Sequence, residues 1–224
     1  MRLSDLAQRI LGSLIEKALA TPQAYPLSVN ALRLAANQTT GRDPITDHDD
    51  AAISEGLREL SGNSLVRAAY ARRSSTPKYE HTLGEHLEIG EDAVAVLGVL
   101  LLRGPQTLGE LRQRTERLHH FGEIAEVQQV LELLAAHPFG ALCEELPRRP
   151  GQKEARWRHL LGGEEAGGQS GSGHAAEAEA PVVAGVDGAA RADAVQLRVA
   201  LAELQTEVTD LRHEIERLKR FVGA

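Results

Sequence analysis

The chain has 224 residues, of which 42% are hydrophobic, 3% aromatic and 25% charged, and its formal net charge is −7. This length suits one domain of ordinary size or two small ones, and the scarcity of aromatic residues favours short helices around aliphatic cores. The single cysteine, Cys143, excludes an internal disulfide and a zinc cluster of several thiolates. The longest apolar run, residues 93–102, is too short to span a bilayer, and no apolar export segment follows Met1. We therefore expect a protein of the bacterial cytoplasm with no membrane partner.

The negative charge is concentrated in one segment. Residues 164–190 hold five carboxylates and no Lys or Arg, while residues 191–224 hold six charges of each sign. The first 163 residues therefore carry a formal charge of only −2. Because residues 164–190 are rich in Gly, Ala, Ser and Glu, we predict that they form a disordered linker. An acidic chain gives no support to nucleic-acid binding, although it does not exclude it.

The first half of the chain predicts three helices and a hairpin. Apolar residues at helical spacing begin at Leu3, with Ser4 as the expected N-cap. A second, short helix is expected after the cap residue Ser28, and a third after a cap at Thr46. Residues 65–70 and 78–83 then predict two strands, joined by a polar tip at 71–77.

The same order of elements recurs in the second half. Apolar spacing from Ala93 to Leu101 predicts a helix that ends at Gly104-Pro105. A capping box of Thr107 and Glu110 opens a second, and apolar spacing from Ile124 predicts a third. Three helices and a two-stranded hairpin, repeated twice, are typical of winged helix-turn-helix domains. We therefore predict a mainly α fold with small β-hairpins (α+β), made of two winged-helix domains that pack together. The second hairpin is expected at 141–146 and 156–161 around a basic tip at 147–155, and the domains at 1–86 and 87–163.

Apolar residues near the C-terminus follow an unbroken spacing of four and three, which is the heptad pattern of a coiled coil. They are Leu197, Leu201, Leu204, Val208, Leu211, Ile215, Leu218 and Val222. β-Branched residues prevail at the a positions and Leu occupies every d position, which favours a parallel dimer. We predict that residues 191–222 form a parallel dimeric coiled coil, so that the protein is a homodimer. The alternative is a lone amphipathic helix packed on the body of the protein.

Several motifs resemble those of the YceH family of bacterial proteins. In the first half they are Thr21-Pro22, Tyr25-Pro26-Leu27-Ser28, Asn30, Asn37-Gln38, Arg42 and Pro44. In the second half they are residues 100–104, Gln106-Thr107, 109–112, Leu146-Pro147-Arg148, Pro150-Gly151, Lys153-Glu154, Arg156 and His159-Leu160. The resemblance covers residues 3–163 and implies a tandem winged-helix fold, but it implies little about activity because the family is uncharacterised. Ala36 and Thr39 stand where a cysteine and a lysine are common, and the missing lysine weakens an anion-contact role for this loop.

The sequence contains no recognisable enzyme motif. Patterns typical of zinc proteases, thiol redox sites, phosphate-binding loops and serine hydrolases are all absent. His119 and His120 are adjacent, so on a helix they point about 100° apart and are poorly placed to bind one metal. Cys143 lies on a predicted strand and is most simply a small buried hydrophobe. We predict no catalytic residues, no cofactor and no metal.

The second predicted wing carries the densest basic cluster of the chain. The candidate nucleic-acid-binding residues are Arg148, Arg149, Lys153, Arg156 and Arg158 on this wing, and Arg72, Arg73 and Lys78 on the first. A basic wing can follow the phosphates of DNA or enter its minor groove. The alternative is a solvated hairpin tip whose charges pair with Glu144, Glu145 and Glu154.

Two other features bear on recognition. Both predicted third helices, residues 46–60 and 122–136, are rich in carboxylates, whereas a helix that reads DNA normally presents Arg, Lys, Asn or Gln. The polar loop at 37–44 offers Asn37, Gln38 and Arg42, and Arg42 is suited to hold a carboxylate or a phosphate. The alternative is that Asn37 and Gln38 only cap the preceding helix and satisfy the backbone of the loop.

Two classes of function remain open at this point. A DNA-binding transcriptional regulator has a narrow lead because many winged helices bind DNA, but this argument is one of fold analogy. A protein–protein interaction adaptor, in which the acidic third helices dock a partner protein without DNA, is the alternative. The placement of charge favours the adaptor, and the frequency of the fold favours the regulator.

The heptad segment is expected to control the oligomeric state. Replacing Val208 and Ile215 together with Asp places like charges in the apolar seam, so the dimer should be lost. Light scattering of the full chain measures this directly. A dimer that persists in the double variant would assign dimerisation to the first 163 residues instead.

Overall fold

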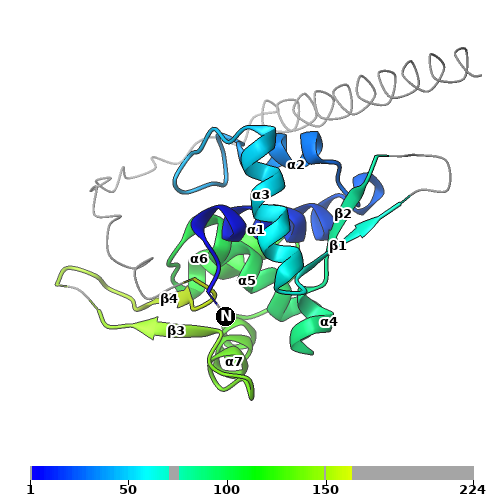
Figure 1. Cartoon of the computed structure of the whole chain (residues 1–224). Helices are drawn as coiled ribbons and strands as arrows, with labels where there is room; N and C mark the ends of the chain where they lie inside the picture. Colours follow the sequence, from blue (N-terminus) through cyan, green and yellow to red (C-terminus); the bar gives the residue numbers. More distant parts are fainter. Residues whose placement is uncertain (1, 71–75, 149, 163–224) are drawn as a thin grey trace, which may run out of the picture. The chain divides into compact units, whose positions relative to one another are not determined.

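The computed structural model describes residues 2–70, 76–148 and 150–162 (Figure 1). In this part of the chain it is a mixed α/β fold with seven α-helices and two small antiparallel hairpins, as the sequence predicts at that level. No helix in these ranges is long and apolar enough to cross a membrane. The predicted linker at 164–190 and the predicted coiled coil at 191–222, with all its heptad residues, lie outside the described residues.

The first half contains the three predicted helices and the predicted hairpin. Its elements are α1 (Asp5–Ala20), the 3-10 helix η1 (Pro22–Ala24), α2 (Val29–Ala36), α3 (Asp50–Gly62), β1 (Val66–Ala69) and β2 (Lys78–His81). The side chains of Ser4 and Ser28 cap α1 and α2 by accepting from Ala7 N and Ala31 N, as expected.

The expected cap of the third helix at Thr46 is wrong. Asp49 caps α3 instead, and its side chain accepts from the backbone N–H of Ala52. The reason is a tertiary contact: the Asn37 amide donates to the carbonyl of His48 and accepts from its N–H, at 2.8 and 2.9 Å. These two bonds use the backbone of residue 48 outside any helix, so α3 begins only after it.

The second half repeats this plan after a short helix that the sequence did not predict. Its elements are α4 (Leu83–Leu87), α5 (Glu91–Arg103), α6 (Leu108–Thr115), α7 (Ile124–Ala135), β3 (Cys143–Leu146) and β4 (Arg156–His159). The capping box of Thr107 and Glu110 at the start of α6 is confirmed. The predicted domain boundary after residue 86 falls within α4.

The two hairpins are equivalent in register. Leu27, just before α2, bridges Tyr79 of β2, and Gln106, just before α6, bridges Trp157 of β4. Each hairpin also carries a cross-strand ion pair at the same place, but with the charges exchanged. Arg67 pairs with Glu80 in the first hairpin, and Glu144 pairs with Arg158 in the second. The two halves are therefore structural repeats, although their surfaces differ in charge.

Helices α1 and α5 hold the two halves together. They form the most extensive contact between any two described elements, and Figure 1 shows them at the centre with one hairpin on either side. All residues of α5 from Ala93 to Leu102 are buried, as are those of α1 from Ala7 to Ile15. A helix buried on every side needs small residues wherever another helix crosses it closely.

Two glycines at equivalent positions allow this crossing. A Cβ on Gly12 of α1 would lie 2.8 Å from Leu102 Cγ and 3.1 Å from Leu101 Cβ. A Cβ on Gly98 of α5 would lie 2.7 Å from Ile15 Cγ2. When Leu11-Gly12 is aligned with Leu97-Gly98, Ile15 is aligned with Leu101. Gly98 contacts Ile15 and Gly12 contacts Leu101, so each glycine contacts the residue that lies three positions after the other glycine. The contact between the halves is thus reciprocal.

Substituting these glycines should destabilise the fold. Gly98→Ala forces a methyl group against the branched Cβ region of Ile15, so we expect the free energy of unfolding to fall by about 2 kcal/mol. Gly109→Ala in α6 is the matched control, because no atom lies within 4 Å of its added Cβ. A better helix former at this half-buried position should leave stability unchanged or raise it by up to about 1 kcal/mol. Urea denaturation measures both, and equal effects would contradict the close crossing.

Candidate functional site

Two candidate arginines of the second hairpin are held in ion pairs, Arg156 with α6 and Arg158 with the neighbouring strand β3. Arg156 Nη1 lies 3.0 Å from Glu110 Oε2 and donates to the carbonyl of Pro105 at 2.9 Å. Arg158 Nε donates to Glu144 Oε1 at 2.6 Å. Glu110 thus caps α6 and binds Arg156 at once. Each arginine thus already has a carboxylate partner, which lowers its attraction for a phosphate.

The tip of the same hairpin is different. Arg148 and Lys153 are exposed and form no ion pair with any residue that the structure describes, while Arg149 lies outside the described residues. Trp157 is only 9% exposed, so it does not offer a ring for stacking on a base. The basic cluster expected from the sequence is therefore divided between paired arginines at its base and unpaired cations at its tip.

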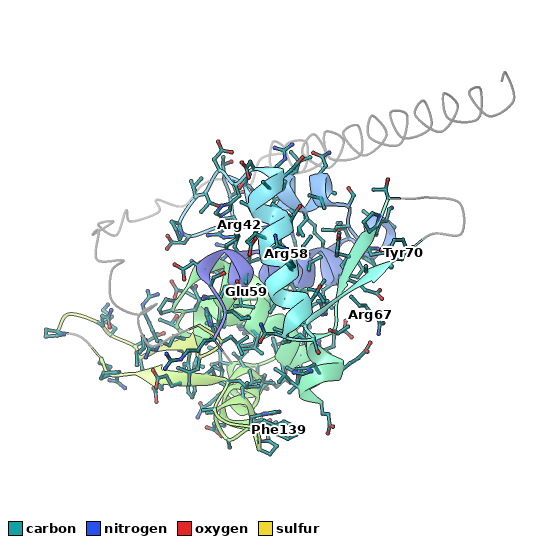
Figure 2. All side chains as sticks on the ribbon, viewed as in Figure 1. Arg42, Arg58, Glu59, Arg67, Tyr70 and Phe139 are labelled. Atoms are coloured by element: carbon teal, nitrogen blue, oxygen red, sulfur yellow. The ribbon has the colours of Figure 1, made fainter. Side chains whose placement is uncertain are left out.

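The first hairpin offers less positive charge. Arg72 and Arg73 lie outside the described residues, and Lys78 is exposed at the start of β2. Arg67, an exposed neighbour that the sequence analysis did not single out, pairs with Glu80 and with Glu85 of α4. Figure 2 shows Arg67 and the exposed Tyr70 on this hairpin.

The loop at 37–44 uses its three candidate residues internally. The side chain of Arg42 is fully buried, and it donates to both oxygens of Glu16, to the carbonyls of Ala35 and Gly41, and to Gln38 Oε1. Asn37 holds the backbone of His48, as described above. With Arg42 enclosed, none of its donors faces an external carboxylate or phosphate. Asn37 is the C-cap residue of α2 and its side chain satisfies backbone groups, as the alternative suggested for it, whereas Gln38 accepts from Arg42 instead.

Charged residues of α1 support this loop, and sequence reasoning missed them. Arg9 is 4% exposed and donates from Nη2 to the carbonyl of Pro44. Burial lowers the pKa of Arg9, and the nearby Arg42 guanidinium lowers it further. Arg9, Ser13 and Glu16 follow one another at helical spacing in an otherwise apolar stretch, and that pattern was the available signal of a buried polar contact.

Cys143 and His159 face each other across β3 and β4. Burial raises the pKa of the Cys143 thiol to about 12, and burial, followed by the charge of Arg158, lowers the pKa of His159 to about 4. Both groups are therefore neutral at pH 7, which is the opposite of an activated thiolate–imidazolium pair. In the described ranges no group of three His, Cys, Asp or Glu residues is arranged to hold a metal ion.

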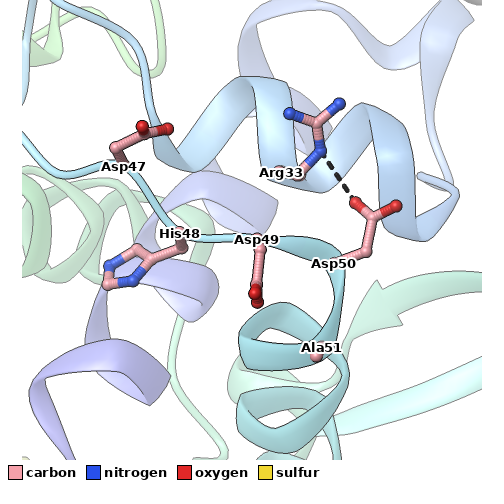
Figure 3. Close-up of a pocket in the computed structure, with 6 residues that line it drawn as sticks. All are labelled: Arg33, Asp47, His48, Asp49, Asp50 and Ala51. Atoms are coloured by element: carbon pink, nitrogen blue, oxygen red, sulfur yellow. Dashed lines mark ion pairs between the residues drawn. The ribbon is translucent and has the colours of Figure 1, made fainter.

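An open pocket of about 500 Å³ lies at the N-terminus of α3 (Figure 3). Its lining residues are Arg33, Asp47, His48, Asp49, Asp50 and Ala51. Arg33 Nε pairs with Asp50 Oδ1 at 2.7 Å, and Asp49 is used as the helix cap. The remaining carboxylate, Asp47, makes the rim acidic, so the pocket disfavours phosphate.

The outward faces of α3 and α7 carry few free positive charges. On α3 the exposed Arg58 pairs with Glu55 three residues earlier. On α7 the exposed residues are Ile124, Ala125, Glu126, Gln128, Gln129, Glu132 and Leu133, with no Lys or Arg among them. Leu133 and Phe139 are 72% and 74% exposed, and Figure 2 shows Phe139 beside α7.

Comparison with known proteins places this arrangement in a family. Residues 3–152 match the model of the family described as "Protein of unknown function, DUF480". The chain belongs to this family. Curated members named "UPF0502 protein" include one from Dechloromonas aromatica, 43% identical over 94% of this chain and 93% of its own length. Others come from Opitutus terrae, 47% identical over 72% of this chain and 70% of its own, and Pseudomonas aeruginosa, 48% identical over 71% and 70%.

The DUF480 match covers most of the surfaces described above. It runs from α1 to the tip of the second hairpin, so it includes α3, α7, the 37–44 loop and Arg148. It ends before Lys153 and before β4, which carries Arg156 and Arg158. The similarity to the Dechloromonas protein extends further, over 211 residues.

Arg42 should matter for stability rather than for recognition. Arg42→Met removes the cation that faces Glu16 and leaves the carbonyl of Ala35 without its donor, so we expect the free energy of unfolding to fall by about 3 kcal/mol. The control is Arg58→Met, which breaks an exposed i,i+3 pair and should change stability by less than about 0.5 kcal/mol. Urea denaturation compares them. An Arg42→Met variant as stable as the wild type would contradict this structural role and leave recognition as the role of Arg42.

Proposed function

We propose that this protein is a dimeric tandem winged-helix adaptor of the bacterial cytoplasm, which docks a partner protein and catalyses no reaction. The winged-helix interpretation is supported by the order of three helices and a hairpin in each half. The bridges from Leu27 to β2 and from Gln106 to β4 support it too, because each pairs a residue just before the second helix of its half with the hairpin. Dimerisation rests on the heptad residues at 197–222.

The observation that carries the adaptor proposal is the charge of the two third helices. In a winged helix that reads DNA, this helix enters the major groove between two phosphate backbones. Here α7 presents Glu126, Glu132 and neutral side chains, and the exposed arginine of α3 is paired with Glu55. Carboxylates brought close to phosphates would weaken binding, and an exposed leucine cannot hydrogen-bond to a base edge. A protein surface suits such helices better.

A second candidate, DNA binding by the wing, is favoured by Arg148 and Lys153. These cations are exposed and unpaired among the described residues, and Arg149 lies between them in sequence. Contacts to phosphates carry no sequence information directly, so this binding would be weak, nearly independent of sequence and strongly dependent on salt. A dimer would present two such tips, and their effective concentration would raise the overall affinity.

One experiment separates the two functions. The full chain is captured from a lysate of its own bacterium with and without nuclease, and its affinity for random DNA duplexes is measured by fluorescence anisotropy over a salt series. The adaptor proposal expects protein partners that survive nuclease, and no saturable DNA binding at low salt.

DNA binding that weakens uniformly when Arg148 and Lys153 are both replaced with Ala would contradict the adaptor proposal. In that case the slope of log affinity against log salt should flatten by about two units, because two phosphate contacts are lost. The matched control is Arg58→Ala with Arg67→Ala, which removes two exposed arginines from other elements. Its slope should equal that of the wild-type chain if the wing alone holds the DNA.

A further inference from the structure

The outward side of α7 combines small and large apolar residues. Ala125, Gln129, Leu133 and Ala136 follow one another at intervals of four, four and three, so they share one face of the helix. Leu133 and Phe139 are the two most exposed large hydrophobic residues that the structure describes. We call Ala125, Gln129, Glu132, Leu133, Ala136 and Phe139 the α7 surface. The core does not require Leu133, because Leu131 and Leu134 already cover the inner side of the helix.

The position of Phe139 is held by its neighbour. His137 Nε2 lies 2.8 Å from the carbonyl of Leu87 in α4, and the N–H of Phe139 donates to His137 Nδ1 at 3.4 Å. The neutral imidazole with its proton on Nε2 satisfies both contacts. The two rings also pack at 5.6 Å between centroids. Phe139 is therefore presented on a supported turn next to α7, which lowers the entropy lost on binding.

The surroundings of this surface are acidic. Residues 118–147 contain five glutamates and no Lys or Arg. Of these, Glu144 is neutralised by Arg158. Glu126 accepts from the N–H of Gly122 and Glu132 from the amide of Gln128, and neither forms an ion pair with a described residue. One cation lies nearby, because Arg112 of α6 donates to the carbonyls of Phe121 and Gly122 just before α7. The carboxylates of the segment outnumber it, so the exposed apolar side chains lie in a region of net negative charge.

We propose that the α7 surface docks a basic amphipathic helix of a partner protein, and this inference rests on the adaptor function proposed above. Leu133 and Phe139 would pack against the apolar face of that helix, and Glu126 and Glu132 would pair with Lys or Arg at its margins. The small side chains of Ala125 and Ala136 let a second helix approach closely. DNA, an anionic membrane and the α7 surface of a second copy all carry negative charge, so the same glutamates disfavour them.

The test places a photo-crosslinking amino acid at Gln129 in the full chain, inside living cells. The control position is Ser54, which is exposed on the outward side of α3. Crosslinked peptides are identified by mass spectrometry, and the captured segment is then synthesised and titrated against the purified chain. The expected result is a crosslink from Gln129 to a segment that has apolar residues at helical spacing flanked by Lys or Arg.

Substitutions then connect the crosslink to the surface. Leu133→Asp should weaken binding of the synthetic segment at least tenfold, whereas Ile45→Asp, at a residue 62% exposed on another loop, should leave it unchanged. Both sites are exposed, so neither variant should lose its folded circular dichroism spectrum. Glu126→Gln with Glu132→Gln should weaken binding and reduce its dependence on salt.

The outcomes distinguish this inference from the adaptor function. A protein crosslink from Ser54 with none from Gln129 would overturn the α7 surface and leave the adaptor function standing. A crosslink from Gln129 to an acidic segment, or to a second copy of the chain, would also overturn it. The loss of all captured material after nuclease treatment would overturn both proposals.

Discussion

The described fold depends on the close crossing of α1 and α5. Two helices buried on every side approach each other because Gly12 and Gly98 have no side chain at the contact. Each glycine accepts a branched side chain from the other helix, so neither half supplies the whole interface. Since the first helices of the two halves are used in this way, the third helices and the hairpins remain at the periphery.

A second constraint is electrostatic and lies beside the first. The 37–44 loop is held to α1 by Arg42 with Glu16 and by Arg9 with the carbonyl of Pro44, and to α5 by a backbone bond from Asp43 to Leu102. A buried guanidinium is stabilised when its donors are used, and Arg42 meets that condition, whereas the buried Nη1 of Arg9 has no hydrogen-bond partner among the described residues. The loop therefore joins both central helices to the start of α3. Its polar composition, which resembles that of a recognition loop, serves the interior of the protein.

The two halves share a plan but differ in what they present. The exchange of charge between Arg67–Glu80 and Glu144–Arg158 keeps a cross-strand ion pair in each hairpin while altering the pattern seen from outside. The first half adds an acidic pocket at the start of α3, and the second adds exposed apolar side chains on and after α7. An adaptor with two unlike surfaces is able to hold two different segments of a partner, and this asymmetry is easier to reconcile with protein docking than with a repeated DNA site.

Local sequence signals determined much of the described secondary structure. The caps Ser4 and Ser28, the capping box of Thr107 and Glu110, and the two hairpins depend on residues within a few positions of one another, and all were predictable. The heptad pattern at 197–222 is a local signal of the same kind, and it remains a prediction because it lies outside the described residues.

Only the tertiary structure decided which polar residues are free. Arg42 finds Glu16 across 26 residues, Arg156 finds Glu110 across 46, and Asn37 moves the start of α3 by holding His48. Sequence spacing does not encode such distant partners, because they depend on how the central helices pack. That packing decides which charges are buried and which stay available at the surface, and the proposed function depends on the available ones.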